Sequence, residues 1–219
     1  IHMSQYMHFA INQKHENIWI AQREGRAKDS DDRTQESVLK MLTLGGPAEG
    51  KTTADIIRNI KDMNIVPLIE YDPCDYLKAQ EFQQKRDIQG WKKSKQDDLD
   101  NMKIGIWGKK GHVHYEAAPC INDWLDTLDA SAIDRADIFR IIAEHIDHEI
   151  HRNYRIYTSN KAALAELNGE KVDAPEFENY LEDKISRIKV ENPDVPFLRE
   201  RILTMYANPL RNYNAAHAQ

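Results

Sequence analysis

Cysteine is scarce in this sequence, with Cys74 and Cys120 the only two in 219 residues. Two widely separated thiols form neither a metal-binding pair nor a disulfide framework, so small folds stapled by zinc or by disulfides are excluded. Also missing are a run of roughly 18 apolar residues, which a transmembrane helix needs, and a basic start followed by a short apolar stretch, which directs secretion. We therefore expect a cytoplasmic protein that makes no membrane contact.

Positive charge is in the minority as well, because 30 Lys and Arg face 36 Asp and Glu, for a net charge of -6. This balance gives no clear nucleic-acid surface, since capture of a phosphate backbone needs clustered basic residues. One basic segment, residues 92–96 (KKSKQ), is followed at once by DDLD, which is typical of a solvated loop. The hydrophobic content of 41% is that of an ordinary globular protein with a buried core.

The first 36 residues are expected to lie outside the main fold. Residues 1–3 (IHM) resemble a cloning remnant, and a short amphipathic segment follows them. Residues 25–37 (GRAKDSDDRTQES) are polar throughout, as linkers and exposed loops are. We predict a short N-terminal segment and polar linker over 1–36 and a single domain over 37–219.

The domain is predicted to begin with a βαβ unit. Residues 37–44 (SVLKMLTL) are an apolar run of strand length that ends at two glycines, and residues 64–72 (NIVPLIEYD) are a second such run. Between them, residues 52–63 carry isoleucines at helical spacing. A hairpin is predicted over 103–117, and helical spacing dominates from there to the C-terminus. The predicted fold class is α/β, a P-loop-type three-layer core with a mainly helical C-terminal half.

The segment from residue 45 to 52 (GGPAEGKT) fits the phosphate-loop pattern G-x-x-x-x-G-K-[ST]. Backbone N–H groups of such a loop, with the free amides of the helix behind it, form an anion cradle. Lys51 would reach the β- and γ-phosphates of ATP or GTP, and the Thr52 hydroxyl would ligate Mg²⁺. The predicted cradle residues are Gly45, Gly46, Gly50, Lys51 and Thr52. In the other interpretation, the glycines only permit a turn.

The run LGGPAEGKTT followed by IEYDPCDYLK resembles the P-loop kinases of the zeta-toxin type, mainly over residues 37–80. The resemblance implies transfer of the γ-phosphate of ATP or GTP to a small hydroxyl-bearing acceptor. It also implies an aspartate after the second strand that orients the acceptor, which is Asp72 or Asp75 in this chain. Arginines in the C-terminal part of that family face the transferring phosphate, and Arg199 and Arg201 are the candidates here.

Two other functions remain open from the residues. Cys74 follows the second predicted strand near a helix start, so a Cys-His hydrolase could use Cys74 and His114, completed by Asn122 or Asp123. Alternatively, the helical C-terminal half binds a protein partner and the P-loop core is degenerate. Thiol labelling and nucleotide binding would separate these alternatives.

The histidines form two groups. His112 and His114 would share one face of a strand, and with Tyr-Glu after them they resemble the His-x-His end of lysostaphin-type zinc peptidases. Surface histidines on an edge strand are the favoured interpretation. The second group, His145, His148 and His151, is expected on a solvated helix face, where neighbouring carboxylates would raise the histidine pKa values.

Overall fold

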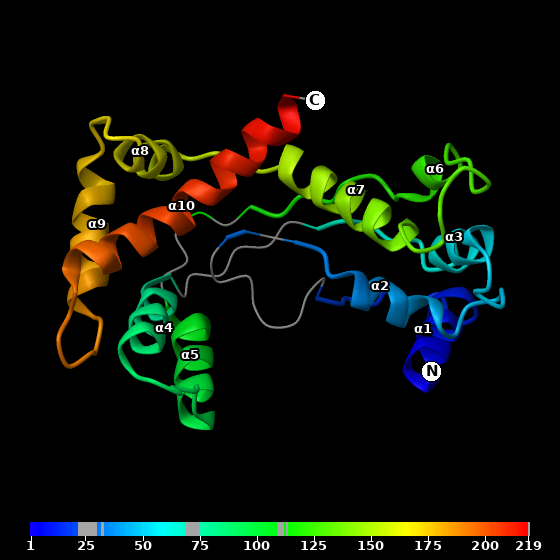
Figure 1. Cartoon of the computed structure of the whole chain (residues 1–219), viewed down its shortest axis with the longest axis horizontal. Helices are drawn as coiled ribbons and strands as arrows, with labels where there is room; N and C mark the ends of the chain where they lie inside the picture. The colour runs from blue at the N-terminus through cyan, green and yellow to red at the C-terminus, as the bar shows by residue number, and fades with distance from the viewer. Residues whose placement is uncertain (22–29, 32, 69–74, 109–111, 113, 219) are drawn as a thin grey trace. The chain divides into compact units, whose positions relative to one another are not determined.

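In a computed structural model, helices joined by loops make up the described part of the protein, which comprises residues 1–21, 30–31, 33–68, 75–108, 112 and 114–218 (Figure 1). The helices fall into two compact units. Unit 1 contains α1 (His2–Asn12), α2 (Glu36–Thr43), α3 (Thr53–Lys61), α6 (Asn122–Leu125) and α7 (Ile138–Arg152). Unit 2 contains α4 (Asp75–Asp87), α5 (Lys95–Trp107), α8 (Thr158–Leu167), α9 (Pro175–Ser186) and α10 (Val195–His217). Across the described ranges, we find no helix long and apolar enough to cross a bilayer.

The predicted α/β three-layer core is wrong. Residues 37–44 were expected to be its first strand, but they lie almost entirely within α2. Leu39 and Leu42 are buried on one side of this helix, and Glu36 pairs with Lys40 one turn along at 3.0 Å. A short apolar run fits a buried strand and a helix equally well by pattern, so tertiary packing decides between them. Here the good helix formers Leu, Met and Lys favour the helix.

The other predicted elements had mixed outcomes. The helix over 52–63 is confirmed as α3, and so are the helices of the C-terminal half. Within residues 64–72, Leu68 forms only an isolated antiparallel bridge with Ala117, and residues 69–72 lie outside the described residues. The hairpin over 103–117 is wrong at its start, because α5 continues to Trp107.

Unit 1 buries one apolar face from each of its longer helices. α2 packs against α1, α3 and α7, and α6 packs against α3. The fully buried side chains at the centre are Leu39, Ile56, Ile60, Ile121, Leu125, Ile138, Ile142 and Ile150. Since α1 packs on this core, the N-terminal 36 residues include part of the fold.

Unit 2 is organised around α10, which packs against α4, α8 and α9. Its buried core includes Leu181, Leu198, Ile202, Leu203 and Met205. Arg199 of α10 joins the two shorter helices, because its guanidinium donates to Glu166 of α8 at 2.6 Å and to Glu178 of α9 at 2.6 Å. These hydrogen bonds raise the pKa of Arg199 and lower that of Glu178.

Candidate functional site

The loop predicted to hold phosphate connects α2 to α3, and close packing explains two of its glycines. A Cβ added to Gly45 would lie 2.6 Å from the backbone Cα of Gln5 in α1. At Gly46 it would lie 2.7 Å from the Cβ of Asn59 in α3. Both positions therefore require glycine for contacts within the fold. Gly50 has a φ of 72°, in the left-handed region that favours glycine.

The backbone N–H groups of this loop are mostly engaged within the protein. Their acceptors are Ser4 Oγ for Gly45 at 2.8 Å, the Thr43 carbonyl for Gly46 at 3.3 Å, Asn59 Oδ1 for Ala48 at 2.8 Å, and Asp55 Oδ2 for Lys51 and Thr52 at 3.0 and 3.1 Å. The bond from the Thr52 N–H is the main reason that the pKa of Asp55 is lowered. The Asp55 carboxylate thus accepts hydrogen bonds at the N-terminus of α3, where a P-loop would bind phosphate.

Two side chains of the loop also have partners within the protein. The Lys51 ammonium is paired with Glu49 at 2.5 Å, and the Thr52 hydroxyl accepts from the backbone N–H of Asp55 at 3.1 Å as the cap of α3. This capping box fixes the start of the helix. The loop therefore has the geometry of a helix entry, and nucleotide and Mg²⁺ binding through it stays a prediction.

The structure does not bring the remaining predicted site residues to this loop within unit 1. Asp72 and Cys74 lie outside the described residues, and Asp75 begins α4. Arg199 and Arg201 belong to unit 2, whereas the loop belongs to unit 1. Arg201 contacts Glu200, and its guanidinium carbon lies 5.3 Å from the centre of the Phe197 ring.

The two histidine groups have different surroundings, with His112 exposed and His151 buried. His112 lies 5.5 Å from the Tyr157 ring, and across the residues that are described no three metal-ligating side chains come together. In α7, His151 is buried and His145 stacks on Trp124 with ring centres 3.7 Å apart. Burial lowers the pKa of His145 and outweighs the opposing effect of Glu149. The expected rise is therefore wrong for His145.

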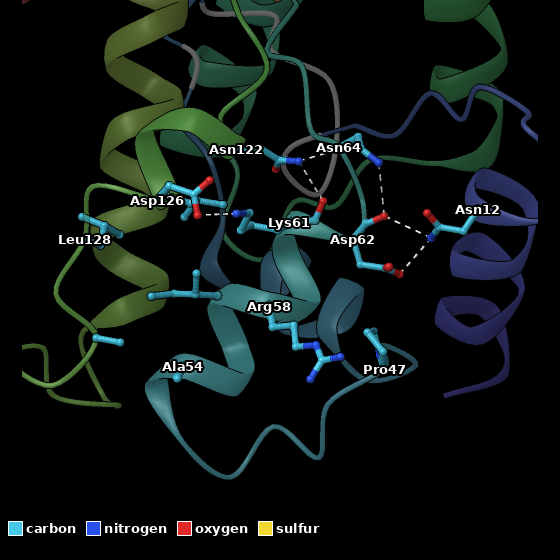
Figure 2. A pocket seen from close by; sticks show the side chains of 13 residues that line it. Asn12, Pro47, Ala54, Arg58, Lys61, Asp62, Asn64, Asn122, Asp126 and Leu128 are labelled. Atoms are coloured by element: carbon cyan, nitrogen blue, oxygen red, sulfur yellow. Dashed lines mark hydrogen bonds and ion pairs between the residues drawn. The ribbon is translucent and has the colours of Figure 1, made fainter.

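A hollow of about 690 Å³ opens on one side of α3, entirely within unit 1 (Figure 2). We call it the α3 hollow. Its apolar lining consists of Pro47, Ala54, Ile57, Leu125, Leu128 and Ala130, and its polar lining of Asn12, Arg58, Lys61, Asp62, Asn64, Asn122 and Asp126. The phosphate-loop segment thus contributes a proline to this hollow. Apolar walls with a few polar groups are typical of small-molecule sites.

The two cations of the α3 hollow differ in their partners. Lys61 pairs with Asp126, which follows α6. Arg58 lies one helical turn earlier on the same side of α3 and is exposed. Within the described part of the chain, its guanidinium has no hydrogen-bond or ion-pair partner, and it acts on Asp55 only through longer-range attraction. Arg58 is therefore available to an anion.

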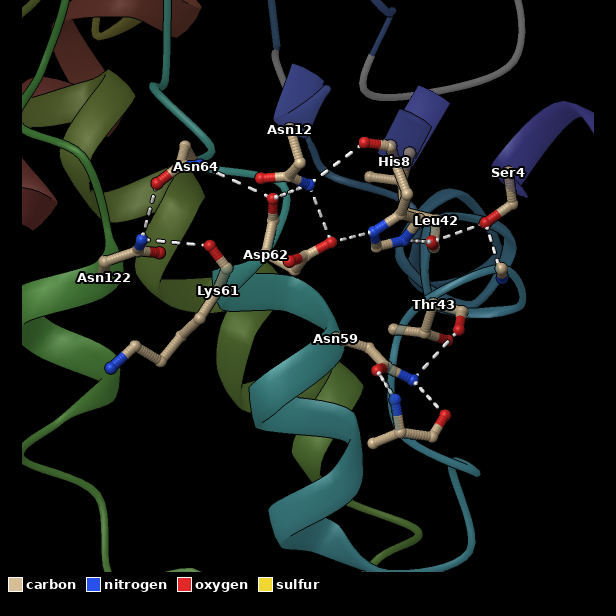
Figure 3. Close-up of polar contacts among 12 residues, drawn as sticks. Ser4, His8, Asn12, Leu42, Thr43, Asn59, Lys61, Asp62, Asn64 and Asn122 are labelled. Carbon is tan, nitrogen blue, oxygen red and sulfur yellow. Dashed lines mark hydrogen bonds and ion pairs between the residues drawn. The ribbon is translucent and has the colours of Figure 1, made fainter. Parts of the chain in front are cut away.

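The wall of the hollow next to α1 is a hydrogen-bonded network (Figure 3). Asp62 accepts from Asn12 Nδ2 at 2.8 Å and contacts His8 Nδ1. The other ring nitrogen of His8 lies 2.9 Å from the Leu42 carbonyl. On the opposite wall, Asn122 donates to the Lys61 carbonyl at 3.0 Å and so joins α6 to the end of α3. Both walls are held in place by bonds between separate elements.

The polar groups of this lining are suited to binding an anion. No serine, threonine, cysteine or histidine is among the lining residues. His8 stands behind Asp62, and both of its ring nitrogens face acceptor atoms, so it cannot act as a base toward a ligand in the hollow. The lining offers the available guanidinium of Arg58, the paired groups of Lys61, Asp62 and Asp126, amide groups and an apolar surface.

No pattern in the sequence marks Arg58, Lys61 or Asp126 as site residues. Arg58 and Lys61 lie off the buried isoleucine face of α3, where charged side chains are normally only solvated. Asp126 approaches them from a segment more than sixty residues away, and no local pattern indicates that contact.

Comparison of the chain with protein families, curated proteins and solved structures gives no match.

Proposed function

We propose that unit 1 binds a small organic anion in the α3 hollow, with the phosphate or carboxylate group at Arg58 and the apolar body against Ile57, Leu125 and Leu128. The observation that supports this proposal is the exposed Arg58 guanidinium, which lacks a partner among the described residues and lies beside apolar walls. Arginine suits this role because its planar fork matches the oxygens of carboxylate and phosphate.

The expected affinity is modest. A hydrogen bond to a charged group contributes about 1.5–3 kcal/mol, and buried apolar area adds about 25 cal/mol per Å². The hollow is open, so a ligand keeps part of its surface in water, and association itself has an entropic cost. These terms place the dissociation constant roughly between micromolar and millimolar.

ATP and GTP are members of this ligand class, so nucleotide binding is compatible with the proposal. Phosphoryl transfer to a small hydroxyl-bearing acceptor, with Asp72 or Asp75 and with Arg199 or Arg201, stays a prediction that rests on the family resemblance. The two ideas differ in the cation that they require, because the phosphate loop needs Lys51 and the α3 hollow needs Arg58.

The test is titration calorimetry of the full chain with ATP, GTP, phenyl phosphate and benzoate, for the parent, Arg58→Ala and Lys51→Ala. Both substitutions remove an exposed cation from unit 1, so each is the matched control for the other. We expect Arg58→Ala to weaken binding at least tenfold and Lys51→Ala to change it less than twofold. The reverse order would assign the anion to the phosphate loop, and no binding by the parent would reject the proposal.

A second candidate function is partner binding through α5 of unit 2. Leu99, Met102 and Ile106 lie within about 60° of one another around this helix and are all exposed, as is Trp107 at 78%. Asn101, the buried residue of α5, lies on the opposite side. Exposed apolar stripes commonly mark interaction surfaces. Loss of concentration-dependent association in Met102→Lys, measured by sedimentation, would support self-association through α5, and a monomeric parent would exclude it.

A further inference from the structure

We infer that Asp126 competes with anionic ligands at the α3 hollow. Its carboxylate pairs with the Lys61 ammonium until an anionic ligand displaces it. The inference rests on the proposed function and adds its regulation. It assigns Lys61 as a second anion-binding residue and predicts a preference for ligands that carry two negative charges.

The position of Lys61 makes it the natural second cation. It follows Arg58 by three residues on α3, and residues at that spacing have their Cβ atoms roughly 5–6 Å apart on one helix face. Both residues line the hollow. A phosphate dianion has two negative charges and three terminal oxygens, so it can pair with both cations at once, whereas a carboxylate has a single charge, which Arg58 alone balances.

Asp126 is held at this place by the fold. Leu125, directly before it, is buried at 1% exposure, and Asn122 at the start of α6 donates to the Lys61 carbonyl at 3.0 Å. The backbone of α6 is thereby fixed against the end of α3. In consequence the Asp126 carboxylate contacts the Lys61 ammonium, as Figure 2 shows.

The pair is weak enough to exchange. The Asp126 side chain is 63% exposed and that of Lys61 is 32% exposed. An ion pair of this kind contributes little free energy in water, so a ligand that replaces the carboxylate loses little. Of the two carboxylates at the hollow, only that of Asp126 can be displaced in a way that frees a cation. Asp62, the other carboxylate there, is already bound by His8 and Asn12, so Asp126 is the negative group whose removal frees a cation.

Neutralising Asp126 should therefore strengthen binding, whereas loss of a merely structural contact would weaken it. For Asp126→Asn we expect phenyl phosphate to bind the full chain about two- to fivefold more tightly, which corresponds to an exposed ion pair of up to about 1 kcal/mol. Benzoate, a monoanion held by Arg58, should gain less. The Lys61→Gln/Asp126→Asn double variant should show no gain over Lys61→Gln.

The experiment is calorimetry at low ionic strength with phenyl phosphate and benzoate as probes. Asp123→Asn is the matched control, because Asp123 is an exposed aspartate of α6 outside the hollow lining, and it should change affinity less than twofold. If Asp126→Asn binds phenyl phosphate no better than the parent while Arg58→Ala loses binding, the competitor role is overturned and the proposed function stands. If Arg58→Ala binds like the parent, the proposed function itself fails and takes this inference with it.

Discussion

His8 and Asp62 are 54 residues apart in the sequence, and in the structure the Nδ1 of His8 contacts the carboxylate of Asp62. The Nε2 of the same ring lies 2.9 Å from the Leu42 carbonyl, which can only accept a hydrogen bond. Nε2 is therefore the nitrogen that donates to this carbonyl, and Nδ1 faces the Asp62 carboxylate. Through this one buried ring, α1 is joined to the ends of α2 and α3.

Removal of either partner should destabilise unit 1. His8→Ala removes one hydrogen-bond partner from Asp62, which keeps Asn12, and one from the Leu42 carbonyl, which keeps Ser4, and it empties a buried position. We therefore expect the free energy of unfolding to fall by about 2 kcal/mol. Urea denaturation of His8→Ala, Asp62→Ala and the double variant should give a coupling of about 1–2 kcal/mol. His217→Ala, at the exposed end of α10, is the control and should change stability by less than about 0.5 kcal/mol. Additive single effects would show that the contact contributes nothing.

The glycines of the α2–α3 loop should differ in their tolerance of alanine. At Gly45 a methyl group meets the backbone of α1, so Gly45→Ala should cost about 3 kcal/mol or separate α1 from the core. Gly50 has open space around its Cα, so Gly50→Ala should cost only the conformational strain of its positive φ, about 1 kcal/mol. Thermal unfolding of both variants measures the difference. Equal losses would contradict the packing explanation of Gly45.

The stacked pair of His145 and Trp124 predicts a pH dependence of stability. Because burial lowers the pKa of His145 in the folded protein, the unfolded chain binds more protons as the pH falls below about 6.5. The contribution of His145 to stability is thus fully present above that pH and is lost toward lower pH. His145→Phe keeps a stacked ring without a charge. Its unfolding temperature should fall less between pH 7.5 and 5.5 than that of the parent, and an equal fall would contradict this prediction.

Arg199 should stabilise the packing of three helices of unit 2, because it joins α10 to α8 and α9 through ion pairs. Its substitution by alanine leaves Glu166 and Glu178 without their shared cation, and both carboxylates are partly exposed. We expect a loss of about 1 kcal/mol, because the guanidinium makes two-pronged bonds but water can solvate the acids. Glu166→Gln combined with Arg199→Ala should recover part of this loss in chemical denaturation. Unchanged stability of Arg199→Ala would show that these ion pairs do not stabilise unit 2.

Helical periodicity was sufficient to predict a helix where the apolar pattern extends over several turns. Residues 138–152 and 195–217 carry apolar side chains at spacings of three and four over several turns, and both are helices. The short run 37–44 has too few residues to show its period, and α7, one of the helices that pack on it, comes from a distant segment. The same holds for the site, because the contact of Lys61 with Asp126 depends on how α6 docks.

The phosphate-loop pattern illustrates a different limit. Glycine, lysine and threonine occur in the required order, but the sequence does not state what each backbone N–H will bind. Asp55 and Asn59 take several of those groups, and both lie in a helix that was correctly predicted. A pattern can therefore match while its hydrogen-bonding capacity is already used by neighbours.

The weak anchoring of α5 has a consequence for how this helix behaves in solution. Among its described residues only Asn101 is buried, with a hydrogen bond of 3.3 Å to Glu81 in α4, and Ile104 packs, partly buried, against the core of unit 2. A helix with so little packing opens at a small free-energy cost, independently of the rest of its unit. Its amide hydrogens should exchange early, and trypsin should cut first at Lys95 or Lys103. A molecule that covers Leu99, Met102 and Ile106 should slow both processes, because it would stabilise the helix.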